Sequence, residues 1–170
     1  MKTLKGFIVI LTLTLAAVFA ASAQTTLTSL DGTRVDVQGQ NGKVVVLAIG
    51  ASWLPLSNKQ AEFTNVLAKK YAGKDVVFYF VATDSLNSGS KNFASNESIR
   101  KFTTGNKLNV PVLRDPDGAA TLKKFDVEQV PSFVIIDKSG KQFGQPIGGI
   151  DPSGKYDITI GISKAIDSLL

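Results

Sequence analysis

The sequence contains no cysteine and no histidine. Without cysteine the chain forms no disulfide bond and has no thiolate to attack a substrate or to bind a metal ion. Without histidine it has no imidazole that accepts a proton near neutral pH, so Ser-His-Asp and Cys-His catalytic sites are excluded. Structural zinc and blue-copper sites need the same side chains. We therefore expect no metal ion and no cofactor.

Charged residues are also few, at 19% of the chain, whereas hydrophobic residues make up 44%. This balance is typical of a globular protein, and a length of 170 residues predicts one folded domain. The formal net charge is +5, but the lysines are spread along the chain and form no long basic run. Nucleic acid is therefore not expected as a partner.

The first 23 residues have the order of a secretory signal. Met1–Lys5 carries two lysines, residues 6–21 are uncharged and mostly apolar, and Ala21-Ser22-Ala23 has the small-x-small pattern of a signal-peptidase site. A membrane anchor is the alternative, but the apolar run is shorter than the roughly 20 residues that span a bilayer. We predict cleavage after Ala23, which leaves a periplasmic or secreted domain, residues 24–170, without a stable membrane anchor.

Apolar patterns predict strands alternating with helices in the remaining chain. Asp31-Gly32 is a common turn pair and predicts a hairpin over residues 25–37. Further strands are expected at 44–49 (buried on both faces), 76–81, 110–113, 132–137 and 141–146. One helix is expected at 58–72, with Phe63, Val66, Leu67 and Tyr71 on one face. Two more are expected at 96–104 and from Asp117 through Leu122 and Phe125. A C-terminal helix is expected to carry one apolar stripe of Ile158, Ile162, Ala165, Ile166 and Leu169. This order predicts an α/β fold whose mainly parallel sheet has an antiparallel edge.

Three separated motifs follow one another: GKVVVLAIGASWLPLS at 42–57, PVLRDPDG at 111–118 and FDVEQVPSFVIID at 125–137. In the same order they resemble GKVVLVNFWATWCPPC, PVLLDPDG and YGVRGVPTTFLID of the thioredoxin-fold superfamily. The similarity is to its extracytoplasmic TlpA-like and redoxin (AhpC/TSA-like) branch. The resemblance implies a thioredoxin-like three-layer α/β/α sandwich, with a mixed central sheet and an N-terminal β-hairpin extension.

The same resemblance implies that the redox centre is missing. Leu54 and Ser57 stand at the two family cysteine positions, and Ala48 stands where thioredoxins have a buried acid. Thiol–disulfide exchange requires a thiolate, and neither leucine nor serine supplies one. We therefore expect a thioredoxin-like fold without thiol–disulfide exchange activity, and we predict no catalytic residue.

Residues near these positions are candidates for binding. Trp53 is either a surface platform or a packing residue at the strand-to-helix turn. Leu54 and Leu56, on either side of Pro55, form either an exposed apolar patch or a local buried cluster. We expect Ser57 to cap the following helix rather than to act as a nucleophile, because no imidazole is available to activate its hydroxyl.

Val130-Pro131 matches the cis-proline position of the family. The resemblance implies a cis peptide bond there, with the preceding backbone pairing with an extended peptide of a partner. A rigid turn without a ligand remains open. The acidic turn at residues 115–118 lacks the further ligands of a calcium loop, so a turn with Asp117 as helix cap is expected instead.

These observations predict a non-catalytic binding or scaffolding module. Its partner is expected to be a protein or an extended peptide in the cell envelope. The predicted binding residues are Trp53, Leu54, Pro55, Leu56, Ser57, Val130 and Pro131. A thiol–disulfide oxidoreductase or antioxidant enzyme is the alternative that the family alone suggests, and a structural protein without a specific ligand is a third.

Overall fold

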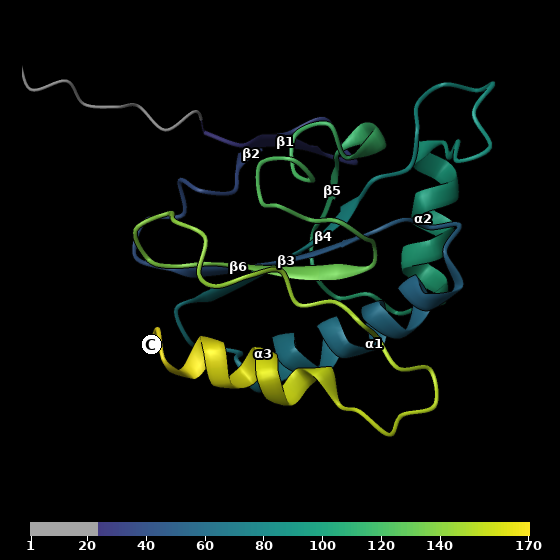
Figure 1. The fold of residues 1–170 in the computed structure, drawn as a ribbon. Coiled ribbons are helices and arrows are strands. Elements are labelled where there is room, and N and C mark those ends of the chain that lie inside the picture. Colours follow the sequence, from purple (N-terminus) through teal and green to yellow (C-terminus); the bar gives the residue numbers. More distant parts are fainter. Residues whose placement is uncertain (1–23) are drawn as a thin grey trace, which may run out of the picture.

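The computed structural model describes residues 24–170, so the predicted signal segment, residues 1–23, lies outside the described residues. The described strands form one mixed sheet in the order β2-β1-β5-β4-β3-β6 (Figure 1). The strands are β1 Thr26–Ser29, β2 Arg34–Asp36, β3 Val44–Gly50, β4 Val76–Ala82, β5 Val112–Arg114 and β6 Ser132–Ile136. The helices are α1 Pro55–Lys70, α2 Asn96–Gly105, the 3-10 turn η1 Pro116–Gly118 and α3 Ile158–Asp167. Strands β3, β4 and β5 run parallel, whereas β6 and the β1–β2 hairpin pair antiparallel. The predicted α/β class, mixed sheet and N-terminal hairpin are confirmed.

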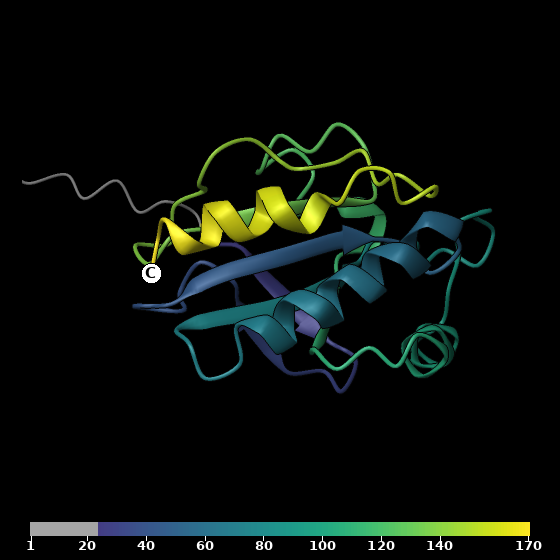
Figure 2. The same cartoon turned by 90° about the horizontal axis from the view of Figure 1, so that it is seen from below.

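Each face of the sheet packs against its own apolar cluster. Helices α1 and α3 lie side by side on one face of the sheet (Figure 2). Leu67 of α1 and Ile162 of α3 belong to the same buried cluster as Val46 of β3. On the opposite face, Leu47 belongs to a second cluster with Phe125, from the segment that follows β5. Alternate side chains of β3 enter the two clusters, so every residue of this strand is buried. The prediction of a strand buried on both faces is confirmed.

Asp31 organises the turn of the N-terminal hairpin. Its carboxylate accepts hydrogen bonds from the Ser29 hydroxyl and from the Thr33 backbone N–H. The Ser29 bond, followed by the Thr33 bonds, lowers the pKa of Asp31 to about 2. A depressed pKa means that these bonds stabilise the fold above pH 3.8 and are lost as the pH falls toward 2.

We expect Ser29→Ala to raise the pKa of Asp31 toward its ordinary value of 3.8, because the largest contribution to the shift is removed. An NMR titration of the Asp31 carboxyl carbon measures this change. Thr28→Ala, one residue away in β1, is the control and should leave the pKa unchanged. An equally low pKa in the Ser29 variant would show that the hydroxyl has no such role.

Helix α1 differs from its prediction in two respects. It begins at Pro55 rather than at residue 58, with Leu54 as N-cap, because proline is well suited to the first helical position. Its buried side is also more polar than expected, since Ser57, Gln60 and Thr64 are buried. Val66, which was predicted to face the core, is 52% exposed. The apolar pattern was misleading here because polar side chains occupy much of the buried stripe.

The helix predicted to begin at Asp117 is not formed. Asp117 adopts a left-handed conformation, with φ of 57°, and only the 3-10 turn η1 and further turns follow β5. The Asp115 carboxylate instead holds the turns after η1, because it accepts the backbone N–H groups of Ala120 and Thr121. Leu122 and Phe125 still pack against the sheet, so this outer layer consists of turns rather than of an α-helix.

The strand predicted at residues 141–146 is reduced to one isolated bridge, and a second bridge follows directly after it. Gln142 pairs with Ile136, and Ile147 pairs with Phe133, with no continuous ladder between them. Gly144 between these bridges has a φ of +68°, a conformation that interrupts an extended strand. Strand β6 is therefore the last strand on this side of the sheet among the described residues.

Candidate functional site

The candidate site lies where β3 ends and β6 begins. These strands pair antiparallel, with Ile49 opposite Ser132, so the loop after β3 and the Val130-Pro131 segment leave the sheet at the same edge. The Val130–Pro131 peptide bond is cis, as the resemblance implied. The fold thus brings together two segments that are almost 80 residues apart in the chain.

A tight turn presents Trp53 at this edge. The Leu54 backbone N–H donates to the Ala51 carbonyl at 3.1 Å, which places Ser52 and Trp53 at the corner of the turn. Trp53 is 47% exposed, Pro55 is exposed and Leu54 is half-buried. The exposure of Trp53 favours the surface-platform interpretation over packing in the core.

Other predicted binding residues lie below this surface. Ser57 is fully buried and is not the helix cap; its hydroxyl accepts the Ala51 backbone N–H at 3.2 Å. The capping prediction was wrong because α1 begins two residues before Ser57. Leu56 packs against the core cluster beneath α1, and Pro131 is buried. The accessible part of the predicted set is therefore Trp53, Leu54 and Pro55, together with the half-buried Val130.

The side chain of Gln60, in α1, links the end of β3 to the start of β6. It is fully buried, and its side-chain amide donates to the Ile49 carbonyl at 3.2 Å and to the Ser132 carbonyl at 2.9 Å. In the sequence, only the spacing of three residues between Ser57 and Gln60 indicated that these two side chains share one face of the helix.

A buried polar cluster on the other side of the turn was also missed. The Asp84 carboxylate is fully buried and accepts hydrogen bonds from the backbone N–H and the hydroxyl of Ser52. Arg114, also buried, donates to the backbone carbonyls of Asp84 and Ala94. Asp84 lies outside all three motifs, so nothing in the sequence indicated its role. Arg114 could have been noticed, because it is a charged residue at a position where the family motif PVLLDPDG has leucine.

Two hollows flank the exposed surface. One, of about 480 Å³, is lined by Gln129 and Ser132 next to Val130-Pro131, and by the carboxylates of Asp126 and Glu128. The other, of about 710 Å³, begins at Pro55 and Leu56 and lies between α1 and the end of α2. One hollow thus borders the Val130-Pro131 segment, and the other borders the start of α1.

The residues at this edge carry neither a thiol nor an imidazole, since the chain has no cysteine and no histidine. Across residues 24–170, no three acidic side chains come together in a way that would hold a metal ion. The buried hydroxyl of Ser57 accepts the Ala51 backbone N–H, and the chain has no histidine to activate it. Within the described part of the chain, no helix has the length and apolar character needed to cross a membrane.

Comparisons with known proteins agree with this geometry. The family model described as Redoxin matches residues 17–142. The thiol-disulfide oxidoreductase ResA of Bacillus thuringiensis is 29% identical over 121 residues, which are 71% of this chain and 64% of the relative. The chain therefore spans slightly less than two thirds of the length of this curated relative.

Solved structures share the fold. The exposed lipoprotein thioredoxin of Streptococcus pneumoniae is 28% identical, with a TM-score of 0.66 over 86% of this chain and 100% of that chain. A secreted disulfide oxidoreductase of Mycobacterium tuberculosis is 24% identical, with a TM-score of 0.64 over 86% and 96% of the two chains. These likenesses confirm the predicted thioredoxin-like fold.

Proposed function

The chain belongs to the Redoxin family, and on this premise we propose that it is a thioredoxin-fold binding or scaffolding module without redox activity. The observation that carries the proposal is the occupation of the family's cysteine positions. Leu54 caps α1, Ser57 is buried in its first turn, and no cysteine occurs in the 170 residues. The fold around these positions is retained, whereas the thiols and the buried acid of the family are replaced.

The proposed contact surface consists of Trp53, Leu54, Pro55 and Val130, with Leu56, Ser57 and Pro131 supporting it from beneath. Exposed tryptophan is frequent among the residues that dominate binding energy. The half-buried Val130 precedes the cis bond, and extended peptides commonly bind by pairing with exposed backbone. A protein or an extended peptide of the cell envelope is therefore the proposed partner.

We also place the protein in the periplasm or outside the cell, with the signal removed after Ala23. The order of charged, apolar and small residues in the first 23 positions supports this location. Two similar proteins are named as a secreted oxidoreductase and an exposed lipoprotein. The mass of the protein recovered from the periplasm or medium tests this, because retention of residues 1–23 would contradict it.

The names of the relatives favour thiol–disulfide oxidoreductase as the alternative function. We expect the purified protein neither to reduce insulin disulfides above the buffer rate nor to consume peroxide in a thiol-dependent reaction. The reason is the lack of any thiolate to form the mixed disulfide. Insulin turbidity and peroxide consumption are the measurements. Turnover that survives repurification would contradict the proposed function.

A further inference from the structure

The turn that carries Trp53 is fastened to the next parallel strand. Strands β3 and β4 end side by side, with Gly50 opposite Ala82. Two residues past the end of β4, the Asp84 carboxylate reaches the turn. Its Oδ1 accepts the Ser52 backbone N–H at 3.0 Å and the Ser52 hydroxyl at 2.6 Å, and its Oδ2 accepts the same N–H at 3.1 Å. Ser52 is therefore held at both its backbone and its side chain, immediately before Trp53.

A fully buried carboxylate is costly unless its charge is compensated. Arg114, at the end of β5, provides the compensation: burial lowers the pKa of Arg114, and the Asp84 carboxylate opposes this effect. Its Nη2 donates to the Asp84 carbonyl at 3.2 Å. The ends of three adjacent parallel strands thus contribute one turn, one carboxylate and one guanidinium to a single buried cluster.

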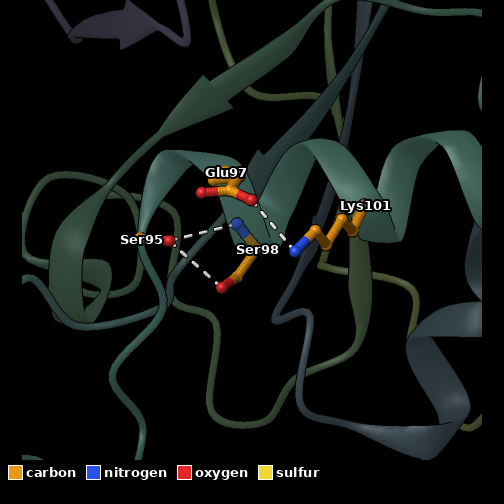
Figure 3. Close-up of polar contacts among 4 residues, drawn as sticks. All are labelled: Ser95, Glu97, Ser98 and Lys101. Atoms are coloured by element: carbon orange, nitrogen blue, oxygen red, sulfur yellow. Dashed lines mark hydrogen bonds and ion pairs between the residues drawn. The ribbon is translucent and has the colours of Figure 1, made fainter.

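Arg114 is itself held by the start of α2. Its Nη1 donates to the Ala94 carbonyl at 2.9 Å and to Oδ1 of Asn96 at 3.3 Å. This end of α2 is well capped, because the Ser95 hydroxyl accepts the Ser98 backbone N–H at 3.1 Å (Figure 3). The cluster is therefore anchored to regular structure on both sides, and the Trp53 turn is its outermost member.

We propose that Asp84, with Arg114 as its charge partner, is a positioning residue that fixes the Ser52–Trp53 turn and thereby presents Trp53 at the surface. The inference rests on the proposed function only for the statement that Trp53 contacts a partner. Two observations distinguish it from general stabilisation of the core. The hydrogen bonds of the Asp84 carboxylate go to the turn alone among the described residues, and the half-exposed Trp53 belongs to neither of the two core clusters that could hold it.

The test uses the fluorescence of Trp53, which is the only tryptophan in the chain. In Asp84→Ala, we expect acrylamide quenching of the folded protein to rise about twofold, because Trp53 is now 47% exposed and a released turn would expose it fully. The emission should shift to longer wavelength. Quenching measured well below the unfolding transition reports on the turn and requires no partner.

Asp115→Ala is the matched control. Asp115 is a second buried carboxylate that accepts two backbone N–H groups and one hydroxyl, but from Ala120 and Thr121 on the opposite face of the sheet. We expect this variant to lose stability while its Trp53 quenching stays at the wild-type value. An equal rise in both variants would overturn the proposal, because it would reflect general loosening.

A second variant covers the case in which Asp84→Ala does not fold. In Asp84→Ala with Arg114→Met, the uncompensated buried charge is removed together with its partner, so folding should be restored. Quenching should nevertheless stay about twofold raised, since Ser52 still lacks its acceptor and Trp53 starts from 47% exposure. Wild-type quenching in this folded double variant would overturn the positioning role. Because the readout is fluorescence alone, this result is independent of whether a partner is found.

Discussion

Replacing Trp53 with alanine should weaken binding of the proposed envelope partner by about 1–4 kcal/mol, roughly a five-fold to several-hundred-fold loss of affinity. The expectation follows from a large aromatic side chain that is half exposed at the corner of a fixed turn. A partner gains its area of apolar contact without ordering a flexible loop, which lowers the cost of association. The partner is first recovered from an envelope extract with the wild-type protein, and calorimetry with each variant gives the affinities.

The matched control for Trp53 is Phe143→Ala. Phe143 is an aromatic residue that is 39% exposed, but it lies beside the middle of β6, with its backbone N–H bonded to Ile135. Its truncation should leave the affinity unchanged. Leu54→Asp should cause a loss similar to that of Trp53→Ala, because it places an unpaired charge in the contact. If Trp53→Ala bound as tightly as wild type, the interface would lie elsewhere on the molecule.

The sequence predicted those elements whose apolar pattern is simple. A continuous apolar run, such as residues 44–49, predicts a strand that is buried on both faces, and β3 has that environment. The hairpin was predictable from Asp31-Gly32, and the C-terminal helix from a single stripe of isoleucines. In each case the local pattern and the tertiary environment agree, so local information was sufficient.

Prediction failed where burial is achieved by polar side chains or by turns. Helix α1 buries Gln60 because its amide satisfies the carbonyls of Ile49 and Ser132, neither of which is its neighbour in sequence. The segment after β5 is fixed by Asp115 and follows no helical period. Such positions depend on contacts between distant residues, and no local pattern encodes them.

The candidate site shows the same division. Its location could be predicted, because motifs placed Trp53 and Val130-Pro131 at one edge, and the cis bond was implied by the resemblance. The hydrogen bonds that hold the Trp53 turn could not be predicted. Asp84 and Ser52 are 32 residues apart in the chain, and they meet only when β3 and β4 pair. The accessible surface is also smaller than predicted, since a helix that begins at Pro55 carries Ser57 inward.

The double substitution Leu54→Cys with Ser57→Cys should give the protein a reversible disulfide that it now lacks. Leu54 is the N-cap residue of α1 and Ser57 lies in its first turn, where the Ser57 backbone N–H donates to the Leu54 carbonyl at 2.9 Å. A turn closed in this way brings its first and last Cα atoms within about 7 Å, close to the roughly 4.4–6.8 Å that a disulfide needs. Titration of free thiols in redox buffers of known composition measures the pairing.

The two introduced thiols should differ in acidity. The sulfur that replaces Leu54 lies at the N-terminus of α1, where the helix dipole favours a thiolate, so its pKa should fall below about 8.5. The sulfur that replaces the fully buried Ser57 loses solvation, which raises its pKa. Insulin reduction should remain slow, because Ala48 supplies no buried acid for proton transfer. Alkylation rates as a function of pH measure both values.

Lys59→Cys with Glu62→Cys is the control pair, because these side chains have the same spacing on α1 and already meet in an ion pair of 2.8 Å. Their thiols should approach each other in the same way but keep ordinary pKa values, since they lie beyond the first turn of the helix. An acidic thiol only in the Leu54 and Ser57 pair would locate the effect at the helix start. If the sulfurs at positions 54 and 57 never paired in the folded protein, the assignment of the vacated cysteine positions would be wrong, and the contact surface built on it would have to be abandoned.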